Sequence, residues 1–199
     1  MASFGGMTSP TPAEPESPGS MTATAHDVAT FWRDAGPKRW FAKNAAFDAE
    51  FKARFEATYR AAAAGRCNDW TDTAQGTLAL LVLLDQFPRN AYRHSPLKFA
   101  ADAKARDVAL TAIETGHDQT IELALRPFFY LPLMHSESLA DQDLSVRLNS
   151  ALDANTQRFA RNHRDIVARF GRFPHRNALL GRTSTPEEID YLREGGFKG

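Results

Sequence analysis

The sequence has a single cysteine, no apolar run long enough to cross a membrane, and no excess of either charge sign. Cys67 alone can form neither an internal disulfide nor a thiolate zinc site. Residues 73–84 are the most apolar stretch, and they are too few to span a bilayer, which takes about 20 residues. Because basic and acidic residues both number 24, no overall field attracts nucleic acid or an anionic membrane. These absences predict a soluble cytoplasmic protein that binds neither.

Length and composition are typical of one globular domain. The chain has 199 residues, of which 43% are hydrophobic and 24% charged, so it can bury a core without disulfides or metals. Residues 1–22 are rich in proline, glycine and serine and lack the apolar core of a secretory signal. We therefore predict a disordered leader at 1–22 and a single all-helical domain at 23–199.

Helical patterns account for almost every segment after the leader. Aromatic residues recur at every fourth position as Phe47, Phe51, Phe55 and Tyr59, which predicts a helix whose aromatic face lies in the core. Capping-box spacings are present at three helix starts: Thr24 with Asp27, Ser138 with Asp141, and Thr185 with Glu188. No segment alternates apolar and polar residues as a strand does. The predicted fold class is all-α, with seven or eight packed helices and no β-sheet.

A short motif is repeated, as DQFPRNA at residues 85–91 and GRFPHRNA at 171–178. Because a residue before proline is pushed out of the α region, we expect Phe87 and Phe173 each to turn the chain at a helix end. The motif places Arg89 and Asn90 after the first turn, and Arg176 and Asn177 after the second. Two hypotheses stay open: these side chains cap helix C-termini, or they face a cavity in which arginine binds an anion.

Further chemistry-bearing residues lie in two segments. His135, Ser136 and Glu137 follow the apolar stretch FFYLPLM, and His163 lies on a basic helix that leads to Arg172 and His175. We expect His135, Glu137 and His175 to be the residues of any acid–base catalysis. The predicted ligand-binding residues are Arg89, Asn90, His163, Arg172, Arg176 and Asn177.

Two more specific sites were weighed and are not favoured. A metal site of His135, Glu137, His163 and His175 lacks the HExxH motif or any other local ligand spacing, so no metal is predicted. A Ser136 nucleophile lacks the GxSxG turn. The sequence identifies no cofactor.

Three blocks, LDQFPRN, FFYLPLMHSE and HRDIVARFGRFPHRN, resemble the signature blocks of a bacterial family known as domain of unknown function 924. The resemblance runs from about Val28 to Leu192. It implies a tetratricopeptide-like (TPR-like) bundle of antiparallel helices, and it implies no reaction, because none is established for the family. The polar positions that match the family's blocks are Asp85, Gln86, Arg89, Asn90, His135, Ser136, Glu137, His163, Arg172, His175, Arg176 and Asn177.

Two functions are compatible with these patterns. The first is a polar pocket for a small anionic metabolite, with acid–base chemistry of a hydrolase kind. The second is a TPR-like module that binds a protein or peptide along a groove without catalysis. A concave site where the two repeated motifs and the HSE segment converge favours the first, and an open groove favours the second.

Overall fold

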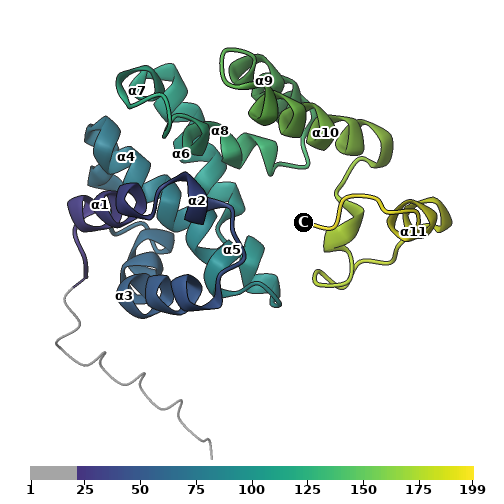
Figure 1. Ribbon diagram of the computed structural model, residues 1–199, viewed down its shortest axis with the longest axis horizontal. Coiled ribbons are helices and arrows are strands. Elements are labelled where there is room, and N and C mark those ends of the chain that lie inside the picture. The colour runs from purple at the N-terminus through teal and green to yellow at the C-terminus, as the bar shows by residue number, and fades with distance from the viewer. Residues whose placement is uncertain (1–21) are drawn as a thin grey trace, which may run out of the picture.

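The computed structural model describes residues 22–199, and every regular element in this range is a helix (Figure 1). The predicted leader at 1–22 therefore falls almost wholly outside the described residues. The α-helices are α1 (Ala25–Ala35), α2 (Pro37–Trp40), α3 (Ala45–Ala63), α4 (Ala74–Leu81), α5 (Phe87–Ala91), α6 (Asp102–Glu114), α7 (His117–Thr120), α8 (Pro127–Met134), α9 (Leu139–Asn149), α10 (Ala154–Phe170) and α11 (Pro186–Arg193). Eight of them have seven or more residues, which confirms the all-α class.

Two of the three predicted capping boxes are present. The hydroxyl groups of Thr24 and Thr185 each accept the backbone N–H of the third residue of their helix. The carboxylate of that third residue in turn accepts the backbone N–H of the threonine. The prediction for Ser138 is wrong, because its side chain makes no cap bond. Asp141, its expected partner, instead accepts hydrogen bonds from Arg106 and from the Ser136 hydroxyl. Asp141 therefore forms a longer-range ion pair with Arg106 instead of a local cap with Ser138.

The aromatic face of α3 lies in the core, as predicted. Phe51 is fully buried, and its ring lies within 5.5 Å, centroid to centroid, of Phe31, Trp32 and Phe87. This cluster joins α1, α3 and α5, which are distant in sequence. Aromatic pairs of this kind contribute beyond the area they bury, so α3 positions the helix that carries the first repeated motif.

The first FP motif does not end its helix, contrary to our expectation. Helix α4 continues through one π turn, Val82–Gln86, into α5, and Phe87 keeps helical dihedrals (φ −54°, ψ −50°). Pro88 would clash with the carbonyl four residues earlier in an α-helix. The wider π turn, in which Phe87 N donates to Val82 O, accommodates the proline. The Arg89 guanidinium also donates to Asp85 O at 2.8 Å.

The second FP motif behaves as predicted. Helix α10 ends at Gly171, which is left-handed (φ 69°), and Phe173 is extended (φ −91°, ψ 107°) before a short 3₁₀ helix, Pro174–Arg176. Phe173 packs with Ile166 and Val167 in a small apolar cluster of its own. The two copies of one motif therefore adopt different backbones.

The helices pack in consecutive pairs, with α8 on α9 and α9 on α10, while α1 and α6 pack on α4. In Figure 1 the chain returns from α11 so that its last residues lie between α11 and α5. Within the described residues, no helix is both long and apolar enough to cross a membrane. The single cysteine, Cys67, is buried, and this burial raises the pKa of its thiol.

Replacing Phe51 by alanine should lower the free energy of unfolding by about 3–5 kcal/mol, because it leaves a cavity among the aromatic rings that pack around it. The matched control is Phe159→Ala, at a side chain that is 43% exposed, which should change stability by about 0.5 kcal/mol. Urea denaturation of both variants measures the difference. Equal losses would show that the aromatic face of α3 is not the core.

Candidate functional site

A cavity of about 570 Å³ lies where α5, α10, the 3₁₀ helix Pro174–Arg176 and the last residues of the chain meet. Its charged and polar side chains are basic groups and imidazoles, without an acidic side chain among the described residues that line it. The lining residues with nitrogen side chains are Lys43, Arg89, Arg93, His94, Lys98, His135, His163, His175, Arg176 and Lys198. Phe41, Phe99, Leu179, Phe197 and Gly199 complete the wall.

The arginines of the two repeated motifs meet on one carboxylate. Arg89 binds Asp102 through its two terminal guanidinium nitrogens, at 2.8 and 3.1 Å. Arg176 approaches the same carboxylate at 3.4 Å. Asp102 begins α6, so one carboxylate at a helix start pairs with an arginine from each motif. Both arginines line the cavity, as the cavity hypothesis expects.

The asparagines of the motifs do not line the cavity. Asn90 donates to Asp48 at 2.7 Å, and Asn177 donates to Glu188 at 3.2 Å and to Ser184 at 3.1 Å. Each asparagine thus ties its motif to a neighbouring helix. Of our predicted ligand-binding residues, Arg89, His163 and Arg176 line the cavity, and Asn90 and Asn177 lie behind it.

Two other predicted site residues are also placed outside the cavity. Arg172 forms a two-bond pair with Glu188, at 2.6 and 2.8 Å. Glu137 accepts two bonds from Arg182, at 2.7 and 2.9 Å, and one from Phe173 N. Because its carboxylate is occupied in this way, Glu137 contacts no histidine of the cavity.

The carboxylate that does contact a histidine is Asp85, from the π turn. Its Oδ1 lies 2.7 Å from Nδ1 of His135, and only 1% of the residue is exposed. His163 uses its Nδ1 against Phe159 O, at 2.8 Å. The ring of Phe197 packs against the imidazoles of His163 and His175. Its centroid is 4.6 Å from that of His163 and 5.1 Å from that of His175.

Neither alternative site weighed from the sequence is assembled. The described residues contain no group of three or more metal-ligating side chains placed to hold an ion, and Glu137 is held apart from the histidines by Arg182. Ser136 donates its hydroxyl to Asp141 at 2.6 Å rather than to a histidine.

Burial, and after it the neighbouring positive charges, lowers the pKa of several groups that line the cavity. Burial, followed by the charges of Arg89 and Arg176, lowers the pKa of Lys98 to about 8, and burial with the charge of Arg89 lowers that of Arg176 to about 10. Burial is also the main cause that lowers the pKa of His163 to about 4 and that of His175 to about 3. The imidazoles of His163 and His175 are therefore neutral at pH 7, beside cations that lack enough counter-charge.

Sequence reasoning assigned no role to Asp85, Asp102, Lys98 or Phe197. Asp85 precedes Arg89 by four residues within the first motif, so the helical spacing could have paired them. Asp102 begins α6 as an ordinary acidic helix start, and nothing local relates Lys98 or Phe197 to the motifs. These residues join the site only through tertiary packing.

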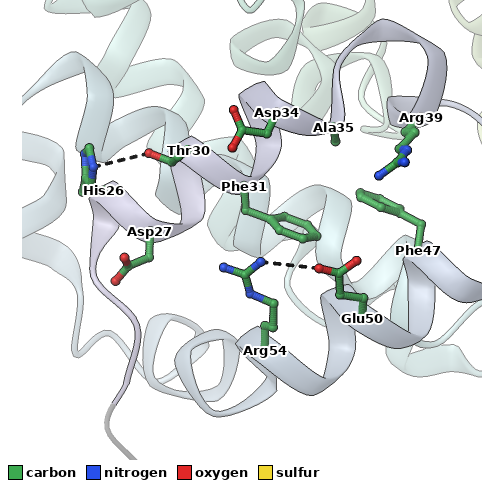
Figure 2. A pocket seen from close by; sticks show the side chains of 10 residues that line it. All are labelled: His26, Asp27, Thr30, Phe31, Asp34, Ala35, Arg39, Phe47, Glu50 and Arg54. Carbon is green, nitrogen blue, oxygen red and sulfur yellow. Dashed lines mark hydrogen bonds and ion pairs between the residues drawn. The ribbon is translucent and has the colours of Figure 1, made fainter.

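A second cavity, of about 350 Å³, lies between α1, α2 and α3 (Figure 2). Phe31 forms its floor, and acidic and basic side chains alternate around it. These side chains already have local partners, since Asp27 belongs to the capping box of α1 and Arg54 pairs with Glu50 at 3.4 Å. Mixed charge and surface pairing make it the weaker candidate.

Residues 28–196 match the family described as bacterial protein of unknown function (DUF924). The chain belongs to this family. The DUF924 chain is also similar to a solved structure titled "Structure of Protein of Unknown Function ATU0120 from Agrobacterium tumefaciens". The two are 49% identical, the match covers 86% of this chain and 97% of that one, and the TM-score is 0.84. No curated protein matches the chain. The family membership inferred from the three blocks is thus confirmed.

Replacing Asp102 by asparagine should lower the free energy of unfolding by about 3 kcal/mol, because Arg89 and Arg176 lose their shared counter-ion in a poorly solvated place. Asp107→Asn on the same helix is the control. The side chain of Asp107 is 74% exposed, and its loss should cost about 0.5 kcal/mol. Urea denaturation at low salt checks this, and equal effects of the two variants would contradict the shared-carboxylate arrangement.

Acid should destabilise the DUF924 chain partly through His163. Because the folded pKa of about 4 lies below the usual value near 6.5, the unfolded state takes up the proton first. Stability is therefore full above pH 6.5 and is lost as the pH falls toward 4, by about 1–2 kcal/mol between pH 7 and pH 5. His163→Gln should remove that part of the pH dependence. Denaturation curves at pH 7, 6 and 5 that fall equally for both proteins would contradict it.

Proposed function

We propose that the DUF924 chain binds a small anionic molecule in the cationic cavity. The observation that carries the proposal is the composition of the wall, which brings together basic groups and imidazoles with no acidic side chain among the described residues. In a chain whose charges balance overall, such a concentration of one sign on the wall of a cavity needs a specific reason. An anion held by several guanidinium and ammonium groups provides one.

The nearby carboxylates do not neutralise this wall completely. Asp85, Asp102 and Asp48 are each engaged by arginines that also line the cavity. Lys98, in contrast, forms no ion pair with any described residue, and its pKa is lowered to about 8 by burial and by Arg89 and Arg176. A lysine held in this state gains from any negative charge that enters the cavity.

The size of the cavity suits a metabolite. A volume of about 570 Å³ falls within the roughly 300–1,000 Å³ of small-molecule sites. Phe99 and Phe197 also line the cavity. Their apolar rings would contact the uncharged part of a ligand. The anionic part would contact Lys98, Arg89 and Arg176.

Acid–base chemistry of a hydrolase kind is the second part of the proposal. His135 and His175, both named as catalytic candidates from the sequence, line the cavity beside the proposed anion site. Glu137 is not available to them, because Arg182 holds it. The carboxylate that supports acid–base work in this arrangement is Asp85.

The alternative function, a TPR-like module for a protein or peptide, stays a prediction. The exposed large apolar side chains that could contact a partner include Leu97, Leu123 and Ile189, which lie on separate elements. The charged cavity supports the small-molecule proposal more directly.

Pyrophosphate, phosphate and citrate should raise the melting temperature of the protein more than chloride does at equal ionic strength. A ligand at about 100 times its dissociation constant adds roughly 2.7 kcal/mol to stability. Lys98→Met should weaken binding by about tenfold to a hundredfold, as expected for the loss of one charged hydrogen bond. Lys38→Met, at an exposed lysine outside the cavity, should leave binding unchanged.

Affinity should also fall as the pH rises through about 8, the pKa of Lys98, because the neutral amine attracts anions less. Calorimetric titration of pyrophosphate at pH 7, 8 and 9 measures this. The proposal fails if none of the anions stabilises the protein above the chloride control, or if Lys98→Met and Lys38→Met respond alike.

A further inference from the structure

The π turn Val82–Gln86 places a carboxylate behind the wall of the cavity. Asp85 is 1% exposed, and each of its oxygens has a partner. Oδ1 contacts His135 Nδ1 at 2.7 Å and Arg89 at 3.2 Å, and Oδ2 accepts from Gln86 at 2.6 Å. Turns of this type within α-helices are frequent at functional sites.

The partners of Asp85 determine its ionisation. Burial alone would keep the carboxyl neutral, but Arg89 and His135 outweigh it and lower the pKa of Asp85 to about 2. An ionised carboxylate only accepts hydrogen bonds. The 2.7 Å contact therefore requires that Nδ1 of His135 carries the hydrogen. The other ring nitrogen, Nε2, is left as the one that can bind or release a proton.

His135 lines the cavity, and 16% of its side chain is exposed. Burial, with the charge of Arg89, lowers the pKa of its imidazole, so Nε2 carries a lone pair at neutral pH. The charged and titratable groups that face it come from five other elements: Asp85 in the π turn, Arg89 on α5, Asp102 on α6, His163 on α10, and Arg176 in the 3₁₀ helix Pro174–Arg176. Arg176 also donates to the backbone oxygen of His135 at 2.8 Å.

Two other imidazoles of the cavity, those of His163 and His175, lack this support. His163 is held by a neutral backbone oxygen, and Nδ1 of His175 is buried without a hydrogen-bond partner among the described residues. Neither contacts a carboxylate. The geometry therefore distinguishes His135 from two neighbours of the same chemical type.

We propose that Asp85 and His135 form a general-base pair that acts on the anionic molecule bound in the cavity. Asp85 is a positioning residue, which fixes the tautomer of His135. Nε2 of His135 then accepts a proton from a water molecule or a hydroxyl group of the ligand, so that an O–H bond breaks as the Nε2–H bond forms. This inference rests on the proposed anion site for its substrate, and on the Asp85–His135 contact for its base.

The tautomer can be measured on the whole protein without a ligand. Long-range ¹H–¹⁵N NMR spectra of ¹⁵N-histidine-labelled protein at pH 7 should show His135 as the neutral Nδ1–H form, with assignment from His135→Gln. Asp85→Asn should lose this single form and give a mixture, because an amide can either donate or accept. Detection of the Nε2–H form or of imidazolium in the parent protein would overturn the proposal.

Chemical modification tests the second requirement, a reactive Nε2 that is open to the cavity. Diethyl pyrocarbonate, followed by mass spectrometry of peptides, should modify His135 of the parent at pH 7, and the rate should fall less between pH 7 and pH 6 than that of a free imidazole, because the pKa of His135 is lowered. Acylation of free N-acetylhistidine should slow over that range as it becomes protonated. A His135 that resists the reagent, or that slows in the same way, contradicts the proposal even if Asp85→Asn fails to fold.

The same reaction separates this inference from the anion site. Pyrophosphate should protect His135 from the reagent in the parent and in Lys38→Met, and should protect much less in Lys98→Met. If His135 has the expected tautomer and reactivity but pyrophosphate gives no protection, the base pair stands and the anion site fails. If pyrophosphate binds and the tautomer is the opposite one, the anion site stands and the base pair fails.

Discussion

The charge arrangement of the cavity depends on one carboxylate, Asp102. Among the described residues it is the one carboxylate that pairs with both Arg89 and Arg176, and so it allows two guanidinium groups to lie close together in a poorly solvated place. It cannot neutralise both of them and Lys98 as well. The ion pairs of Asp102 thus stabilise the packing of α6 against both motifs, and they leave positive charge in excess on the cavity wall. Arg176 is further held between the rings of Phe99 and Phe173, at 4.7 and 4.5 Å.

The helical class, the core face of α3 and the family could be predicted because each depends on local pattern. Phe47, Phe51 and Phe55 repeat with the period of one helix face, and the three signature blocks are continuous in sequence. The fate of Phe87 could not be predicted in this way. Phe87 and Phe173 both precede proline, yet only Phe173 leaves the helix, because burial of Val82–Gln86 favours a widened turn over a chain break.

The residues of the candidate site could be predicted only where they belong to a local sequence pattern. The motif pointed to Arg89 and Arg176, which do meet, and the apolar run pointed to His135. Glu137 was the nearest carboxylate in sequence, whereas the carboxylate that contacts His135 is Asp85, fifty residues away along the chain. Local proximity is a poor guide to which acid supports which base, since ion pairing redistributes partners once the helices pack.

The π turn also fixes how the chain tolerates changes in length. A π turn holds one residue more than the α-helical turn it replaces, and each residue of an α-helix rotates the next side chain by about 100°. Loss of a single residue from Val82–Gln86 would remove the wide turn that accommodates Pro88 and would turn every side chain of α5 by that angle. Arg89 would then leave the cavity wall and Asn90 would lose Asp48. Deletions should therefore be better tolerated in the loops than in this turn.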